Sequence, residues 1–461
     1  MSAQDEERRK ALKPAVNMAS AVAIAKKVWG LRIDDDDDDP PKLLESYDDC
    51  NFYISGTLPP SALDPSPTKQ KYLLKVQNGV ESATPQVLAF QHAMMSRLTS
   101  AGLQCQRPVL LPPSLPPSSD NVEPHFIHYQ TLPVLAGPPT RLAIRLLQWV
   151  EGTSLVNISP PAFSSSSAPN LPPTPPPLAL ALLSAGRYLG KIDQALLNFN
   201  HPGAHRQHMW DVRSLSQLRA WVQYVPEEGE KRRLVLSVIE AFEKEVVPVA
   251  EKGEQETAQE EENRRTEEEK TAGFRQGVVM GDWNDANIIV DPLRPSLVLG
   301  AIDFGDSLWS WRINDVAIAM AYAAVSSFGK THPVHAAALL LHGFVATASS
   351  IPPWEAGHLL TLACGRLAIS VTLGAYSFAQ NPENEYLLIH AQPAWSALRT
   401  LWGRQRERVV EVFRRAAEGG REGGEGDEEF WKEIAGKRFG LVGEEDWVGL
   451  CREGEGDKGN E

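Results

Sequence analysis

The sequence predicts an α+β protein in which a small part with a mixed sheet precedes a larger, mainly helical part. Two observations predict this class. Between residues 41 and 151, short runs rich in Leu, Val, Ile and aromatic residues alternate with turn residues, as strands do, around one stretch of helical spacing. From residue 178 onward, long segments with apolar residues at helical spacing dominate.

Helices in the first part are expected over residues 14–31 and 85–102. Both begin at or just after Pro, carry apolar residues at helical spacing, and the second ends at Gly. The strand-like segments are residues 43–56 (a strand, a turn and a second strand), 72–78, 125–135 and 140–155. Strands around a single helix make a unit of ordinary domain size.

The second part is expected to be helical except around one polar stretch. Residues 277–292 read as a turn, a polar loop, a short strand and a turn, and 297–304 as a second strand that ends at Asp303. The expected helices are residues 178–196, 214–225, 231–250, 313–325, 333–348, 358–379 and 385–418.

Composition divides the chain into four parts. They are an N-terminal helix with an acidic linker (1–40), the mixed part (41–151), the helical part (152–416) and an acidic, Gly- and Glu-rich tail (417–461). Two insertions, 160–177 and 251–272, are expected to be disordered, because one is low in complexity and rich in Pro and Ser and the other is highly charged.

Charge and cysteine usage exclude several classes of protein. The formal net charge is -14, and most of it comes from the Asp run at 34–39 and the Glu-rich insertion. The remainder is nearly neutral, so we expect neither a nucleic-acid nor a membrane partner. The four cysteines are far apart, and the first residues are charged with both signs. We therefore expect a cytoplasmic protein without a disulfide framework, signal peptide or membrane span.

The stretch from Met280 to Ser307, MGDWNDANIIVDPLRPSLVLGAIDFGDS, carries the chemistry. Asp282 and Asn287 would lie on the loop before one strand and Asp303 at the end of its neighbour, so we expect all three at one edge. Phosphoryl transfer needs a carboxylate to take the acceptor proton and oxygen ligands for Mg²⁺. A lone Asp before a strand is usually a turn former. The order D-x-x-x-x-N and then D-F-G is more specific, because kinases use both spacings.

Through these motifs the chain resembles the aminoglycoside phosphotransferase and choline kinase-like superfamily, and within it the hydroxylysine kinase group. Supporting pieces include SYDDCNFYI at 46–54, YLLKV at 72–76 and RLLQWVEGTSL at 145–155, and the similarity runs from about residue 44 to 402. The resemblance implies a protein-kinase-like two-lobed fold. The small lobe would carry an antiparallel sheet and bind nucleotide, and the larger lobe would be mainly helical.

The resemblance also implies residue roles. They are a catalytic base at Asp282, Mg²⁺ ligands at Asn287 and Asp303, and nucleotide contacts from Lys75, Ser46, Asn51, Gln148 and Val150. Lys75 could instead be a solvent-facing lysine on an edge strand.

Two departures from the superfamily pattern affect these roles. Met280 stands where the superfamily usually has a His that braces the loop, so we expect a looser loop. The helix acid that would pair with Lys75 is replaced by Gln91, and Glu81 is the nearest acid along the chain.

Further residues are open to two interpretations. Asp285 and Asp306 could attract a substrate amine or cap the turns that follow them. Trp309 and Trp311 could form an aromatic wall for an ammonium group or pack as part of a helix. Arg312 and Asp315 are expected to stabilise the start of a helix.

The expected function is a small-molecule kinase. It would move the γ-phosphoryl group of ATP or GTP, with Mg²⁺, to a hydroxyl on a small amino alcohol or hydroxy amino acid, by resemblance 5-hydroxy-L-lysine. The alternatives are a choline, ethanolamine, homoserine or aminoglycoside type of kinase, and a catalytically silent kinase-like binding protein. The sequence leaves the oligomeric state open.

Overall fold

The chain forms two compact units. The computed structural model describes residues 3–33, 39–60, 65–112, 126–158, 176–226, 230–252, 273–380, 391–403 and 405–419. The first unit comprises Met1–Glu151, His201–Gln207 and Ala301–Asp303; the second comprises Gly152–Asn200, His208–Gly300 and Phe304–Glu461. One unit is built on an antiparallel sheet and the other is mainly helical, so the predicted α+β class is confirmed.

A five-stranded antiparallel sheet forms the first unit, in the order β1-β2-β3-β5-β4. Its strands are β1 (Lys42–Leu44), β2 (Cys50–Gly56), β3 (Gln70–Val76), β4 (His128–Leu132) and β5 (Thr140–Gln148). Lys75 of β3 stands opposite Asn51 of β2 and Arg145 of β5. Lys75 therefore lies on a central strand, not on an edge strand.

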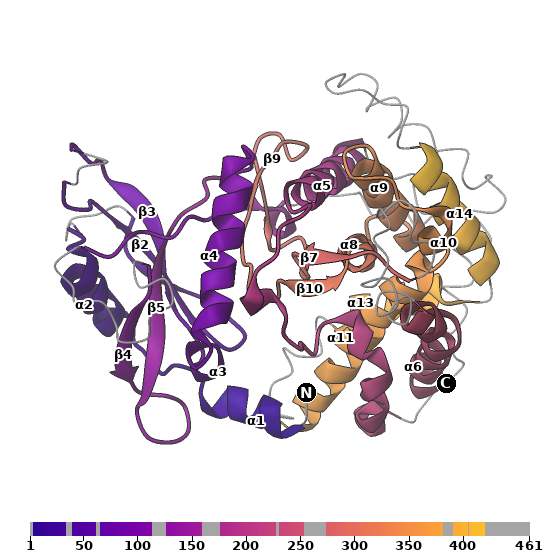
Figure 1. Ribbon diagram of the computed structural model, residues 1–461, viewed down its shortest axis with the longest axis horizontal. Coiled ribbons are helices and arrows are strands. Elements are labelled where there is room, and N and C mark those ends of the chain that lie inside the picture. Colours follow the sequence, from indigo (N-terminus) through magenta and orange to yellow (C-terminus); the bar gives the residue numbers. More distant parts are fainter. Residues whose placement is uncertain are drawn as a thin grey trace, which may run out of the picture. The chain divides into compact units, whose positions relative to one another are not determined.

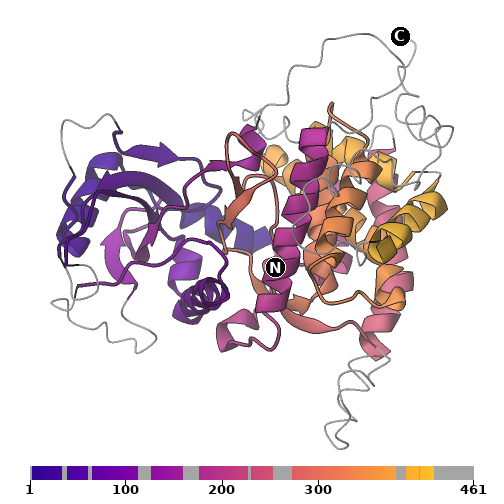
Figure 2. The same ribbon diagram turned by 90° about the horizontal axis from the view of Figure 1, so that it is seen from above.

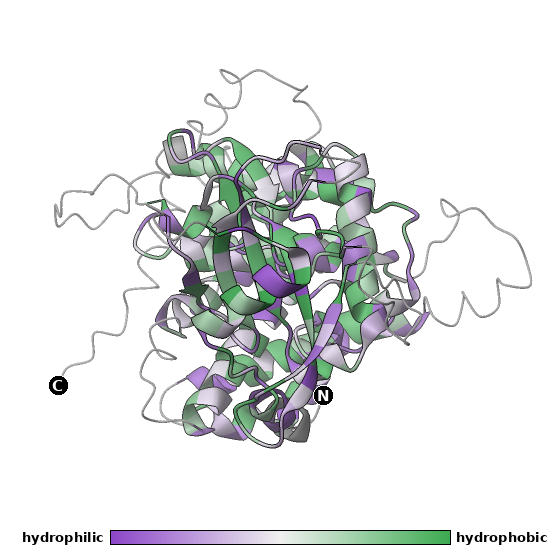
Figure 3. Cartoon of the chain, turned by 90° about the vertical axis from the view of Figure 1, so that its left-hand side faces the viewer, coloured by the Kyte–Doolittle hydropathy of each residue, from purple (hydrophilic) through white to green (hydrophobic). Residues whose placement is uncertain are grey.

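Helices cover both faces of this sheet. Figure 1 shows α2 (Met18–Trp29) on one side and α4 (Pro85–Ser100) on the other. The apolar stripe of α2 packs onto residues of β2, β3 and β5 in one core cluster. The helix expected at 14–31 is therefore a packing helix, and Figure 3 shows green, apolar residues along the strands that it covers.

Short helices in the first unit escaped the sequence analysis. They are α1 (Ala3–Ala11), α3 (Gly79–Ser82) and the 3₁₀ helix η2 (Pro202–Ala204). α1 carries alternating charges and α3 has only four residues, so neither shows a usable apolar period. Most of the predicted acidic linker, residues 34–38, lies outside the described residues.

Six longer helices form most of the second unit. They are α5 (Pro176–Ala195), α8 (Ile313–Ser326), α9 (Pro333–Val345), α11 (Leu359–Gln380), α13 (Ala391–Leu401) and α14 (Arg406–Gly419). α9 packs against α5, α8 and α14, and in Figure 2 the magenta α5 lies beside the orange helices. A Cβ at Gly186 of α5 would lie only 2.0 Å from the carbonyl oxygen of Leu340, so the close approach of α5 and α9 requires glycine there.

Two small antiparallel ladders connect the polar stretch to these helices. β7 (Gln276–Val279) pairs with β10 (Leu308–Trp311), and β6 (Thr153–Ser154), β8 (Ile288–Val290) and β9 (Val298–Ala301) form a three-stranded sheet. The expected hairpin of β8 and β9 is present. β7 corrects the sequence analysis, which placed a turn at its residues, because four residues are too few to show alternation.

Other helical expectations need correction. Residues 214–225 form the 3₁₀ helices η3 (Val212–Ala220) and η4 (Val222–Tyr224), and the helix at 231–250 is α6 (Lys231–Ala241) followed by the π-helical turn η5 (Phe242–Val246). The helix expected at 385–418 is interrupted, because α13 and α14 are separate. The remaining short elements are η1 (Leu155–Asn157) and α10 (Pro353–Ala356). The insertion at 160–177 and the tail lie almost entirely outside the described residues.

α11 is long and apolar enough to cross a membrane by length and composition, and 83% of its most apolar window is buried inside the protein. It carries Arg366, which is 1% exposed. This burial is expected of a core helix. The buried arginine must have hydrogen-bonding or charged partners inside the protein.

Candidate active site

The loop between β7 and β8 carries Asp282. Gly281 makes the sharp turn before it with a φ of +80°, and a Cβ there would lie 2.6 Å from the carbonyl oxygen of Asp306. Only glycine tolerates both conditions. The turn presents Asp282 with its side chain 22% exposed, so the carboxylate is anchored yet open to solvent.

Three side-chain donors hold the Asp282 carboxylate. Its Oδ2 accepts hydrogen bonds from Asn284 Nδ2 at 2.8 Å and from Asn287 Nδ2 at 3.0 Å. Its Oδ1 accepts one from Arg366 Nη2 at 3.0 Å. A carboxylate fixed from three sides keeps one orientation, which is what positioning an acceptor hydroxyl requires.

Arg366 is the second buried charge of this site, and its own partners fix it. Nη2 also donates to the Tyr322 hydroxyl at 2.9 Å, and Nη1 donates to the carbonyl oxygen of Trp210 at 2.5 Å. The guanidinium lies over the rings of both aromatic residues, 4.9 Å from Trp210 and 5.3 Å from Tyr322. Burial by itself lowers the pKa of Arg366, but Tyr322 and Asp282 more than offset it, so the cation persists.

Asp315 of α8 and Ser307 brace the loop at Met280, and the looser loop expected there stays a prediction. The Asp315 carboxylate accepts the backbone N–H groups of Met280 and Gly281, each at 2.9 Å, and Ser307 Oγ donates to the Met280 carbonyl at 3.0 Å. Burial raises the pKa of Asp315 to about 6, against the opposing effect of these two N–H groups. Arg312, which was expected to act with Asp315, instead pairs with Asp193.

The Asn287 side chain is fixed through its amide nitrogen. Its Nδ2 is committed to the carbonyl and the carboxylate of Asp282, at 2.9 and 3.0 Å. The remaining amide atom, Oδ1, is a hard oxygen of the kind that Mg²⁺ prefers. Among the described residues, no group of three or more His, Cys, Asp or Glu could hold a metal ion. Mg²⁺ held by two side chains and substrate phosphates does not need such a group.

In the first unit, Lys75 lies between two carboxylates. Its Nζ is 3.0 Å from Asp49 Oδ2 and 3.3 Å from Asp303 Oδ1. Burial alone lowers the pKa of Lys75, but these two carboxylates hold it above the ordinary value. The partner that the sequence analysis could not identify is therefore Asp49. Glu81, the nearest acid along the chain, pairs with Arg9.

Asp303 combines exposure with an unusual backbone. Its side chain is 47% exposed, and its φ of 57° lies in the left-handed region that non-glycine residues rarely adopt. Its backbone N–H donates to Gln106 Oε1 at 3.3 Å. Such conformations cost free energy and gather at functional sites. The carboxylate atom not facing Lys75 is another hard oxygen, so the donor types of Asn287 and Asp303 both suit Mg²⁺.

The other predicted nucleotide residues lie at the ends of strands in the first unit. Ser46 lies in the turn between β1 and β2, where its Oγ accepts the Asp49 N–H at 3.3 Å. Asn51 Oδ1 is buried without a hydrogen-bond partner among the described residues. Gln148 ends β5, and Val150 follows two residues later. Their contact with nucleotide stays a prediction.

Asp306 lies next to the base candidate, and the two tryptophans lie on a strand. Asp306 Oδ2 is 4.0 Å from the Arg366 nitrogen that binds Asp282, and its Oδ1 is 3.6 Å from His208 Nε2. Trp309 and Trp311 lie on strand β10, not on a helix. Trp311 is buried, with its ring 4.7 Å from that of Phe274. Trp309 is half-buried, and its contact with an ammonium group stays a prediction.

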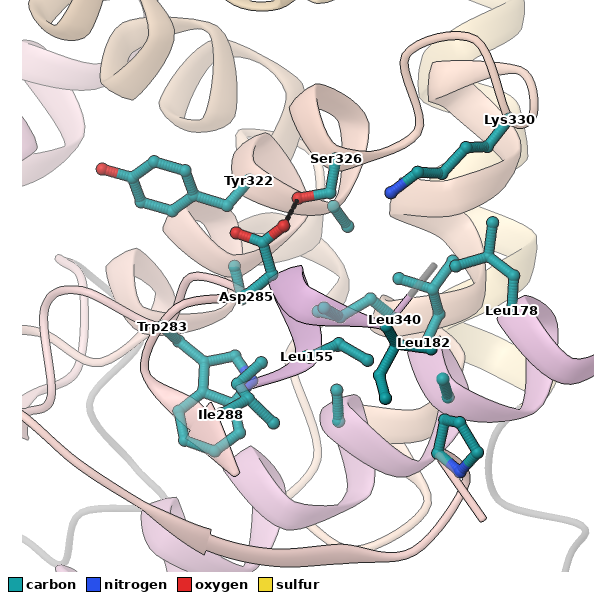
Figure 4. A pocket seen from close by; sticks show the side chains of 16 residues that line it. Leu155, Leu178, Leu182, Trp283, Asp285, Ile288, Tyr322, Ser326, Lys330 and Leu340 are labelled. Carbon is teal, nitrogen blue, oxygen red and sulfur yellow. Dashed lines mark hydrogen bonds between the residues drawn. The ribbon is translucent and has the colours of Figure 1, made fainter. Parts of the chain in front are cut away.

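A cavity of about 170 Å³ opens beside the residues that follow Asp282 (Figure 4). Its walls are mostly apolar and come from η1, α5, β8, α8 and α9. Four residues give it polar character: Asp285, Tyr322, Ser326 and Lys330. Ser326 Oγ donates to Asp285 Oδ2 at 2.6 Å, as the dashed line in Figure 4 marks. A cavity of roughly 150 Å³ accommodates a molecule of the size of benzene, so the space suits a small metabolite.

Sequence reasoning missed Asp49, Arg366, Tyr322 and the bracing role of Asp315. Asp49 carried a usable signal, because it lies in the predicted turn opposite β3. Arg366 carried a weaker one, a single charge within a long apolar helix.

Comparisons with known proteins agree with this geometry. Residues 65–348 match the model of the phosphotransferase enzyme family. The chain is 27% identical to hydroxylysine kinase of Bos taurus over 90% of this chain and 96% of the relative, and 27% identical to that of Xenopus laevis over 87% and 94%. Among solved structures, a microcompartment-associated aminopropanol kinase superposes with a TM-score of 0.51 at 13% identity, covering 82% of this chain and 97% of that one.

Proposed function

The chain belongs to the phosphotransferase enzyme family and is a kinase of small molecules with a hydroxyl acceptor, and from that premise we propose that its acceptor is 5-hydroxy-L-lysine. The names of its curated relatives support this acceptor. One observation carries the chemistry: Asp282 is exposed on one side and held by three donors on the others.

In the proposed reaction, Asp282 accepts a hydrogen bond from the acceptor hydroxyl and takes its proton as the oxygen attacks the γ-phosphorus. One bond forms between this oxygen and phosphorus, and the bond from phosphorus to the β,γ-bridging oxygen breaks. A nucleoside diphosphate leaves with the bonding electrons. Arg366 and the two asparagine amides keep the carboxylate aimed while this happens, and positioning of this kind supplies most of such catalysis.

Lys75 and Asp303 have the chemistry for the phosphate side of the reaction. The Lys75 ammonium, held by two carboxylates, would contact phosphate oxygens. Asn287 and Asp303 would hold Mg²⁺, which neutralises charge on the triphosphate when it is bound. We propose GTP as the preferred donor, with ATP as the alternative.

The acceptor is a diamino acid, and the acidic residues near Asp282 suit its ammonium groups. In 5-hydroxylysine one ammonium group is on the carbon next to the reacting hydroxyl. Asp306 shares Arg366 with Asp282, which supports a contact between Asp306 and that ammonium group. Asp285 lines the cavity and would meet the second ammonium group.

The proposal is tested by product analysis. The purified full chain is incubated with Mg²⁺ and either GTP or ATP, together with 5-hydroxy-L-lysine, choline, ethanolamine or homoserine. We expect a phosphate ester on the hydroxylysine oxygen, identified by mass spectrometry and phosphorus NMR, with GTP the better donor. Phosphorylation of choline or ethanolamine in preference would reject the acceptor, and nucleotide binding without any ester would favour a silent binding protein.

A further inference from the structure

The cavity beside the catalytic loop contains one acid, Asp285, and one base, Lys330, on a mostly apolar surface. Asp285 comes from the loop and Lys330 from the turn that follows α8, where its backbone N–H donates to the Ser327 carbonyl at 2.8 Å. In Figure 4 the ammonium end of Lys330 points toward the side of the cavity where Asp285 and Ser326 lie.

Lys330 and Asp285 can each still bind a charged group of a ligand. Within the described ranges of the chain, Lys330 takes part in no ion pair. Ser326 occupies only Oδ2 of Asp285, which leaves Oδ1 for another donor. The Lys330 ammonium group and the Asp285 carboxylate line one cavity and do not pair with each other. They can bind a ligand that carries both a carboxylate and an ammonium group, because hydrogen bonds between charged groups are stronger than neutral ones.

The apolar walls fit the rest of such a ligand. Leu155, Leu182 and Ile288 line the cavity below its polar groups in Figure 4, and aliphatic carbons could pack against them. Asp285 is three residues from Asp282, so their Cα atoms are within roughly 11 Å. This distance between Asp282 and Asp285 is comparable with the length of an amino acid that has a hydroxyl near the end of its side chain.

From this arrangement we propose that Lys330 binds the carboxylate of the acceptor while Asp285 binds its α-ammonium group, so that the enzyme selects an amino acid over the corresponding amine. This inference rests on the proposed function and names the specificity residue of that same site. With Asp306 near the reacting end, the site then offers two acids and one base, which matches the two ammonium groups and one carboxylate of 5-hydroxylysine.

The test compares two acceptors that differ only in the carboxylate. 5-Hydroxy-L-lysine and 1,5-diaminopentan-2-ol carry the same hydroxyl and the same neighbouring ammonium group. The wild-type kcat/KM should favour the amino acid at least about 30-fold, the scale of a charged hydrogen bond. In Lys330→Met this preference should collapse, mainly through a higher KM for the amino acid, whereas the KM for nucleotide and the kcat/KM for the diamine stay within about twofold.

Matched controls separate recognition from folding. Lys191→Met removes an exposed lysine on α5 and should leave the preference intact, and Lys330→Arg should keep most of it. α-N-Acetyl-5-hydroxylysine, which lacks the α-ammonium charge, should be a poor acceptor for the wild type.

Failure of the proposed role of Lys330 can be distinguished from failure of the proposed acceptor. A wild-type enzyme that phosphorylates both compounds equally, or a Lys330→Met variant with an unchanged preference, overturns the role of Lys330 and leaves the kinase proposal standing. A wild-type protein that phosphorylates neither compound overturns the proposed acceptor itself, and the inference with it.

Discussion

At the scale of single residues, Asp282 shows what a sequence motif contains and what it leaves out. The spacing of Asp282 and Asn287 predicted that they act together, and Asn287 does donate to Asp282. Nothing in the spacing indicates Arg366, which reaches the same carboxylate from α11. Local spacing reports neighbours along the chain, whereas this ion pair depends on how helix α11 packs against the loop between β7 and β8.

Lys75 gives the same lesson for the first unit. The sequence analysis looked for its acid on helix α4, where Gln91 stands, or at Glu81. The actual partner, Asp49, lies one residue before β2 and reaches Lys75 through the β2–β3 pairing. The register between β2 and β3 brings Asp49 and Lys75 together. This register depends on the pairing of the whole sheet, so a local sequence pattern does not reveal it.

Replacing Asp49 tests this assignment. Asp49→Asn removes a carboxylate that holds the Lys75 ammonium, so we expect the KM for Mg²⁺-nucleotide to rise about tenfold, the effect of losing one charged contact. The KM for the acceptor should not change. Steady-state kinetics with each substrate varied in turn give both values.

Glu81→Gln is the matched control, since Glu81 pairs with Arg9 and not with Lys75. It should leave the nucleotide KM within about twofold. Equal effects of the two variants would remove Asp49 from any special role.

At the scale of elements, the predictions succeeded where periodicity was long and failed where it was short. The ends of five helices lie within three residues of their expected bounds: α4, α5, α8, α9 and α11. Each of them presents several turns of apolar spacing. α3 and β7 have four residues each and show no period. The 3₁₀ helices at 212–224 have apolar residues at nearly helical spacing, so sequence alone does not separate them from an α-helix.

The start of α8 contributes the brace of the catalytic loop. Asp315→Ala would leave the N–H groups of Met280 and Gly281 buried without an acceptor, which costs about 1–3 kcal/mol for each group. We therefore expect the free energy of unfolding in urea to fall by roughly 2–4 kcal/mol, together with a lower kcat.

Asp291→Ala is the comparison for that variant. Asp291 also accepts two backbone N–H groups, from Leu293 and Arg294, but in a solvent-exposed turn where water can replace it. Its loss should have a much smaller effect on unfolding. A similar loss in both variants would contradict the bracing role.

At the scale of the whole molecule, the family match and the two units agree on a kinase-like architecture. The first unit contributes the sheet with Lys75 and Asp303, and the second contributes Asp282, Asn287 and the cavity that we propose for the acceptor. That Asp303 acts together with Asp282 and Asn287 on one nucleotide stays a prediction of the sequence analysis. Under the proposed roles, the first unit supplies Lys75 and Asp303 for the nucleotide, and the second supplies the base Asp282 and the further Mg²⁺ ligand Asn287.

The most direct measurement of the central claim, that Asp282 is the catalytic base, is phosphoryl transfer in a single turnover by Asp282→Asn. The asparagine keeps the shape and loses the proton acceptor. We predict a rate at least about 10³-fold below wild type, within the range known for general bases. The dissociation constant of Mg²⁺-nucleotide, measured by calorimetry, should stay within about twofold. A variant that transfers phosphate within tenfold of the wild-type rate would contradict the account.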